Sequence, residues 1–113
     1  MYEDDKLLAY VLDVVARHDA ATPLFLVLST HSIHEPYEVP QKYLDKFSFI
    51  DVEVRQYYAA MVNHIDDVVG NLTAALKAKG MWANTLFVSS SDNGACTAEP
   101  ATPPPSQSAR THP

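Results

Sequence analysis

The sequence predicts an α/β fold in which two parallel strands are joined by a crossover helix and preceded by another helix. Residues 24–28 and 86–90 are short apolar runs, the pattern of strands that are buried on both faces. Residues 52–79 separate these runs and repeat their apolar side chains at helical spacing. A strand, a helix and a second strand form a parallel pair, and the crossover is almost always right-handed. The expected order is therefore helix, strand, helix, strand.

The first helix is predicted over residues 4–18. Its apolar side chains recur every three or four residues, while Asp13, Arg17 and His18 occupy the polar side. The apolar positions are Leu7, Leu8, Val11, Leu12, Val14 and Val15. We expect this helix to bury one face, and residues 20–23 to connect it to the first strand.

Two prolines shape the segment that follows the first strand. Pro36 and Pro40 each exclude a regular strand, because proline cannot donate a ladder hydrogen bond. Pro40 suits the first turn of a helix, since that turn needs no backbone donor. A short helix is therefore predicted over residues 41–46.

The crossover helix is predicted over residues 52–79, the strongest periodic segment. Asp51 is suited to cap its N-terminus, and Gly80 follows two lysines as a C-terminal stop should. Gly70 lies inside the helix and costs about 1 kcal/mol relative to alanine, which indicates close packing there. The apolar stripe consists of Val54, Tyr58, Met61, Ile65, Val68, Leu72 and Leu76.

The composition changes after residue 94. Residues 95–113 are rich in Pro, Ser, Thr and Ala and carry no apolar period, so we predict a disordered tail. Residues 1–94 form the predicted folded part. A parallel sheet needs helices on both faces, which two strands and these helices cannot supply. The pattern therefore indicates a fragment of a larger sheet.

Charge and length exclude several classes of protein. The chain of 113 residues has a formal net charge of −6, and its basic residues are scattered, so nucleic-acid binding is not expected. A membrane-spanning helix needs about 20 consecutive apolar residues, and no apolar run in the sequence approaches that length. The acidic residues 1–6 lack the features of a signal peptide. A single cysteine, Cys96, excludes an internal disulfide, and it has no neighbouring base to activate it.

Polar residues follow each predicted strand. Parallel strands end at the same edge of a sheet, so His34 and the Asp92-Asn93 pair are expected at one edge. Asp92 and Asn93 offer hard oxygen donors suited to Ca²⁺ or Mg²⁺, although an Asp-Asn-Gly turn explains them as well. His34, like His31, could ligate a metal, bind an anion or protonate a leaving group. The alternative for either histidine is a solvated loop side chain.

Two further polar patterns lie in the long helix. Asn71 begins an Asn-Leu-Thr sequon and is a candidate glycosylation site, which matters only for a chain that enters the secretory pathway. Asp66 and Asp67 are adjacent, and adjacent helical positions do not face each other, so a solvated face is expected there.

Residues 23–51 and 55–94, with their spacing, resemble the central part of the catalytic domain in the sulfatase family, in its arylsulfatase B-like (N-acetylgalactosamine-4-sulfatase-like) branch. The resemblance implies an alkaline-phosphatase/sulfatase-like parallel sheet and the hydrolysis of sulfuric esters. It implies that Asp92 and Asn93, in the family's DNG motif, help to bind Ca²⁺. It also implies that His34 contacts the sulfate and assists the leaving alcohol.

The same resemblance implies a formylglycine nucleophile, made from the cysteine of a C-x-P-x-R motif that this sequence lacks. We therefore expect the chain alone to be inactive. The family is mainly lysosomal or secreted, whereas this sequence shows no signal peptide, so localisation is left open. Two alternatives remain: a noncatalytic fragment that binds metal weakly or self-associates through an exposed sheet edge, and a piece of a related phosphoryl-transfer enzyme.

Overall fold

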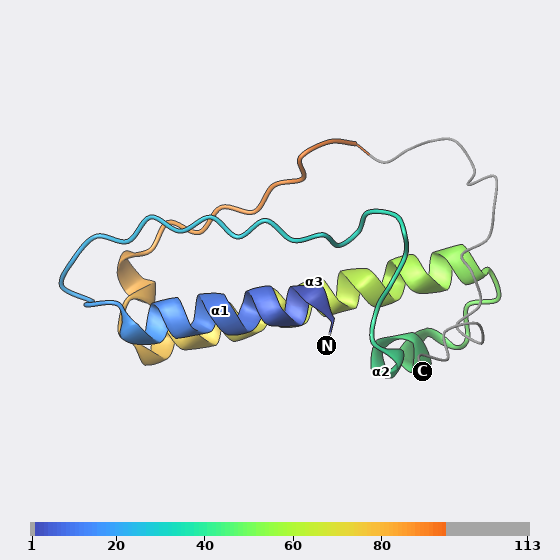
Figure 1. The fold of residues 1–113 in the computed structure, drawn as a ribbon, viewed down its shortest axis with the longest axis horizontal. Coiled ribbons are helices and arrows are strands. Elements are labelled where there is room, and N and C mark those ends of the chain that lie inside the picture. The colour runs from blue at the N-terminus through green and yellow to red at the C-terminus, as the bar shows by residue number, and fades with distance from the viewer. Residues whose placement is uncertain (1, 95–113) are drawn as a thin grey trace, which may run out of the picture.

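The computed structural model describes residues 2–94, and all of its regular elements are helical. They are α1 (Glu3–Arg17), α2 (Gln41–Leu44), the 3-10 turn η1 (Asp45–Phe47), α3 (Glu53–Ala78) and the 3-10 turn η2 (Trp82–Asn84). In Figure 1, α1 lies along the C-terminal half of α3, and both helices run in the same direction. The extended segments that follow α1 and η2 run back the opposite way (Figure 1). The order and directions of these segments are those of a strand–helix–strand unit, with extended chain in place of the strands.

The helices predicted over 4–18, 41–46 and 52–79 are confirmed within one or two residues at most ends, the short one as α2 continued by η1. At the end of α3, Gly80 adopts a positive φ of 74° and donates its N–H to the Lys77 carbonyl at 3.0 Å, as a helix stop requires.

Two details predicted for α3 are wrong. Its N-cap residue is Val52, with no side-chain cap, so Asp51 does not serve this role. Gly70 is exposed, and a β-carbon built there meets nothing within 4 Å. Close packing is therefore not the reason for this glycine.

Two apolar clusters form along one face of α3. The N-terminal cluster joins α3 to α2 and the loop before it, and the C-terminal cluster joins α3 to α1. The buried members of the first are Val39, Tyr43, Leu44, Tyr57, Ala60 and Met61. The buried members of the second are Val11, Val15, Leu72 and Leu76, with Leu26, Leu28, Ala75, Met81 and Trp82 packed against them. A single helix face thus supports both halves of the core.

The predicted parallel sheet is contradicted, because residues 2–94 contain no strand. Residues 24–28 and 86–90 are extended, but no backbone hydrogen bond joins one to the other in this part of the chain. A strand is defined by its ladder of backbone hydrogen bonds, and an apolar run has no ladder without a paired neighbour. The apolar pattern identified extended chain but not its pairing.

Burial along the first extended segment alternates with a period of two. Leu26 and Leu28 pack on the C-terminal cluster, whereas Phe25 is 91% exposed and Val27 is 72% exposed. Leu86 and Val88 are similarly exposed on the second segment, at 89% and 75%. The first segment therefore has one face covered by the helices and one face bare, not the two buried faces that its sequence predicts.

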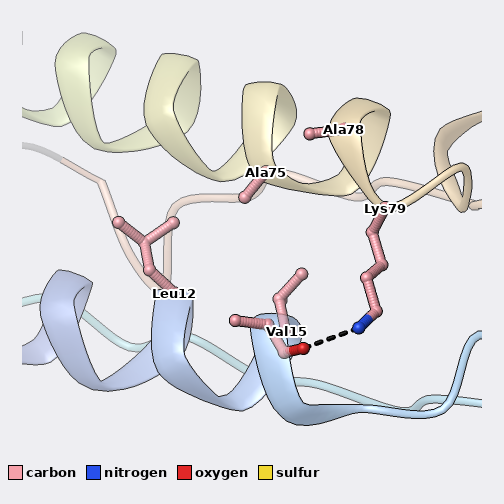
Figure 2. Close-up of a pocket in the computed structure, with 6 residues that line it drawn as sticks. Leu12, Val15, Ala75, Ala78 and Lys79 are labelled. Atoms are coloured by element: carbon pink, nitrogen blue, oxygen red, sulfur yellow. Dashed lines mark hydrogen bonds between the residues drawn. The ribbon is translucent and has the colours of Figure 1, made fainter.

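Lys79 joins the C-terminal ends of the two long helices. It follows α3, and its Nζ donates a hydrogen bond of 2.6 Å to the carbonyl oxygen of Ala16 near the end of α1 (Figure 2). The last carbonyls of a helix lack internal partners and carry partial negative charge, so a cation stabilises them. Figure 2 shows this ammonium group beside a hollow lined by Leu12, Val15 and Ala75.

The predicted tail, residues 95–113, lies outside the described residues. Within residues 2–94, no helix has both the length and the apolar character required to cross a membrane.

We expect Leu76→Ala to lower the free energy of unfolding by about 2–5 kcal/mol, because it opens a cavity where α1 packs on α3. Urea denaturation followed by circular dichroism measures the change. Leu86→Ala removes the same side-chain atoms from an exposed position and should leave stability within about 0.5 kcal/mol. Equal effects of the two variants would contradict the described core.

Candidate functional site

The loop that carries His34 follows the first extended segment. The backbone N–H of His34 donates to the carbonyl of His31 at 2.9 Å, which closes a turn, and the imidazole is exposed. Its Nδ1 lies 2.6 Å from the carbonyl oxygen of Glu35. Because a carbonyl can only accept, Nδ1 must carry the proton. This leaves Nε2 as the atom that can take up or release a proton.

Asp4, in the first turn of α1, anchors this loop. Its carboxylate accepts the backbone N–H of His31 at 3.0 Å on one oxygen. The other oxygen accepts the backbone N–H of Ser32 at 3.2 Å and the Ser32 hydroxyl at 2.6 Å. The phenol oxygen of Tyr2 lies 3.0 Å from the same hydroxyl oxygen. One side chain therefore binds two consecutive backbone amides and a hydroxyl of the loop.

The burial of Asp4 gives these contacts their importance. The residue is 1% exposed, and an ionised carboxylate removed from water without partners costs many kcal/mol. Hydrogen bonds to a charged group contribute about 1.5–3 kcal/mol each, and the first turn of a helix favours negative charge. The buried charge and the loop conformation consequently depend on each other.

The imidazole of His31 contacts another acidic residue of α1. Its Nδ1 lies 3.0 Å from a carboxylate oxygen of Glu3, and both side chains are largely exposed. Exposed ion pairs contribute about 0–1 kcal/mol, so this contact adds little to stability. Of the two loop histidines, His31 is thus paired with a carboxylate, whereas the ring of His34 is bonded through Nδ1 to a backbone carbonyl within residues 2–94.

Asp92 and Asn93 lie at the end of the second extended segment, where both are exposed. The hydroxyl of Ser91 contacts the carbonyl oxygen of Asn93, so the segment ends in a local turn. No group of three or more His, Cys, Asp or Glu side chains suited to a metal ion occurs within residues 2–94. The two donors fit Ca²⁺ in kind but not in number, since Ca²⁺ takes six to eight oxygen ligands.

His34 and Asp92 follow extended segments that run in the same direction in Figure 1. No contact joins His34 to Asp92 or Asn93 in the described part of the chain. The three predicted residues therefore follow two extended segments of the same direction, but the structure does not assemble them into a site.

A buried histidine that the sequence analysis did not single out lies between α1 and α3. His64 is 1% exposed, and its Nε2 lies 2.9 Å from a carboxylate oxygen of Asp5. The rings of Tyr2 and Tyr43 meet its imidazole edge to face, both at 5.0 Å. Its position three residues after Met61 and four before Val68, on the apolar stripe, was the sequence signal for its burial.

Tyr43, in α2, connects this cluster to the polar side of α3. Its hydroxyl donates to a carboxylate oxygen of Asp67 at 2.8 Å. Burial is the main cause that raises the pKa of Tyr43 to about 12, and the hydrogen bond and negative charge of Asp67 raise it further. Asp67 is thus the acceptor for a buried phenol, not simply part of a solvated acidic face.

Asn71, the predicted glycosylation site, lies on the exposed side of α3. Its side-chain nitrogen donates to the backbone carbonyl of Asp67 at 2.7 Å, one helical turn earlier. The sequon therefore lies within a regular helix in this structure.

Comparisons with known proteins agree on one family. A family model described as Sulfatase matches residues 1–112. Arylsulfatase J of Mus musculus is 37% identical over 84 residues, which are 74% of this chain and 14% of that protein. N-acetylgalactosamine-6-sulfatase of Mus musculus is 29% identical over 82 residues, 73% of this chain and 15% of that protein. The chain spans about one seventh of the length of these curated relatives.

The raised pKa of Tyr43 predicts a pH-dependent loss of stability. A folded-state pKa of about 12 lies above the unfolded value of about 10, so the contribution of this group is complete below pH 10. Stability should fall as the pH rises from about 10 to 12, because the unfolded state then loses this proton more readily. Phenolate absorbance measures the titration.

Asp67→Asn should lower the pKa of Tyr43 without restoring the ordinary value, since burial remains the main cause of the shift. Asp66→Asn removes the same charge from the adjacent exposed position and serves as the control. A Tyr43 titration that responds equally to both variants would be inconsistent with the described hydrogen bond.

Proposed function

Because this chain belongs to the sulfatase family, we propose that it is the segment of a sulfuric ester hydrolase that supplies a leaving-group histidine and two metal ligands. The observation that supports this proposal best is the exposure of His34 together with the hydrogen bond that holds its ring. It is exposed on a loop anchored at two neighbouring amides, and its Nδ1 is held by the Glu35 carbonyl. A histidine held in this way has Nε2 available to a substrate that binds beside the loop.

His34 is proposed to contact the sulfate and to protonate the leaving alcohol. A protonated imidazole is attracted to the anionic sulfate, and its Nε2–H can be given to the ester oxygen as the bond to sulfur breaks. During this step the Nδ1 proton stays on the ring, where it is hydrogen-bonded to the Glu35 carbonyl. Nε2 is therefore the nitrogen that gives up its proton.

Asp92 and Asn93 are proposed as two of the ligands of a Ca²⁺ ion. A carboxylate and an amide carbonyl are the oxygen donors that this cation prefers. When bound, the cation would supply positive charge to the sulfate oxygens. Residues 2–94 supply these two donors and no complete ligand group, so the remaining ligands are proposed to lie elsewhere in the enzyme.

The attacking group is not among these residues. Sulfatases use a formylglycine derived from a C-x-P-x-R motif, which the 113-residue sequence does not contain. Cys96, the single cysteine, is in another sequence context and lies outside the described residues. We therefore propose that this chain by itself does not hydrolyse sulfate esters.

A second proposal is that the chain associates with copies of itself. Phe25, Val27, Leu86 and Val88 are exposed on the two extended segments. The backbone of these segments is not engaged in a ladder within residues 2–94, and such edges and apolar patches favour association. This is the alternative in which the chain is a noncatalytic fragment that binds metal weakly or associates with other chains. The phosphoryl-transfer alternative has no specific observation in its favour.

Asn71 is proposed as a glycan attachment site if the chain enters the secretory pathway. Its exposed position on α3 supports access by the transferase. The hydrogen bond from its side chain to Asp67 would have to break first.

A hybrid enzyme tests the role of His34. Residues 2–94 of this chain, which include His18 and His34, would replace the corresponding segment of mouse arylsulfatase J, and hydrolysis of an aryl sulfate would be measured. We expect His34→Ala to lower kcat by about 10²–10⁴-fold, the range for loss of a general acid. His18→Ala is the matched control, because His18 bonds only within its own turn, to Thr22.

The proposal predicts that His18→Ala keeps the activity of the hybrid. Full activity of the His34→Ala hybrid would show that His34 does not take part in the reaction. An inactive hybrid with correct folding would show that this segment does not serve the role of its counterpart.

A further inference from the structure

We propose that Asp4 is the positioning residue for His34. The proposal rests on the function proposed above, since it assigns to Asp4 the task of holding the loop on which the leaving-group histidine lies. Asp4 belongs to α1 and is separated from the loop by 27 and 28 positions along the chain, so the contact is tertiary. It acts on His34 through the loop, by way of the His31 and Ser32 amides and the Ser32 hydroxyl.

Three hydrogen bonds converge on the carboxylate of Asp4. The amides of His31 and Ser32 and the hydroxyl of Ser32 all donate to its carboxylate, at 3.0, 3.2 and 2.6 Å. Only an ionised carboxylate accepts from three donors without presenting a donor itself. An asparagine there would place an NH₂ group against one of these donors. The position therefore requires an aspartate, not merely a polar side chain.

The residues that Asp4 binds are connected to His34 through the loop backbone. The carbonyl of His31 accepts the backbone N–H of His34 at 2.9 Å, so the residue that Asp4 fixes also fixes the backbone of His34. Between them, Ile33 packs against the N-terminal apolar cluster. The turn is thus held by polar bonds at one side and apolar packing at the other, while the imidazole of His34 stays exposed.

Asp4 is itself held in place, because the first turn of α1 is attached to α3. It is 1% exposed in the first turn of α1. The next residue, Asp5, pairs with the buried His64 of α3 at 2.9 Å. The first turn of α1 is consequently fixed to α3, and Asp4 transmits this rigid support to the loop.

Nuclear magnetic resonance of the complete 113-residue chain tests the proposal without substrate. We expect Asp4→Asn to raise the hydrogen-exchange rates of the His31 and Ser32 amides by at least about tenfold. The ring signals of His34 should move toward those of a histidine in a short peptide. Asp13→Asn removes the same charge from an exposed position of the same helix, where it pairs with Arg17, and should change neither readout.

Unchanged ring signals of His34 in Asp4→Asn, with the amides of α3 still protected, would overturn the proposal. If Asp4→Asn loses protection throughout α3, Ser32→Ala decides, because it removes one bond to Asp4 and keeps both amides. It should shift the His34 signals in the same direction by a smaller amount, and unchanged signals would again overturn the proposal. A confirmed effect alongside an active His34→Ala hybrid would refute the proposed function and leave the positioning intact.

Discussion

The apolar face of α3 is the constraint on which the rest of the described structure depends. Its N-terminal half carries Tyr57 and Met61 against α2, and its C-terminal half carries Leu72 and Leu76 against α1. Because α1 packs along α3 in a fixed register, the first turn of α1 lies beside the loop after the first extended segment. Asp4 binds that loop, and Asp5 binds His64 of α3. Core packing thus determines where the candidate histidine lies.

The helices were predictable because their burial follows the helical period. One apolar stripe in 52–79 and another in 4–18 give the two long helices nearly to their ends. The predicted strands fail for a different physical reason. An apolar run such as 24–28 reports which side chains avoid water, but a strand also needs a neighbour for its backbone. Phe25 and Leu86 remain exposed in this structure, so the expected second buried face is absent within residues 2–94.

Some residues of the candidate site could likewise be predicted from the sequence, and others could not. His34, Asp92 and Asn93 were found from their residue types and from their positions after apolar runs. Asp4 was not found, because its role arises from contacts with residues 27 and 28 positions away and from burial in the first turn of a helix. An acidic residue in that turn is ordinarily explained by the helix dipole alone. His64 differs, since its place on the apolar stripe was visible in the sequence.

The central proposal is that this chain supplies groups that protonate the leaving alcohol and bind the metal, but not the group that attacks sulfur. The most direct measurement is the hydrolysis of a chromogenic aryl sulfate by the purified 113-residue chain, with and without added Ca²⁺. The account predicts no phenol release above the uncatalysed rate under either condition. Turnover that persists through purification and disappears in the His34→Ala variant would contradict it, because the chain would then contain its own nucleophile.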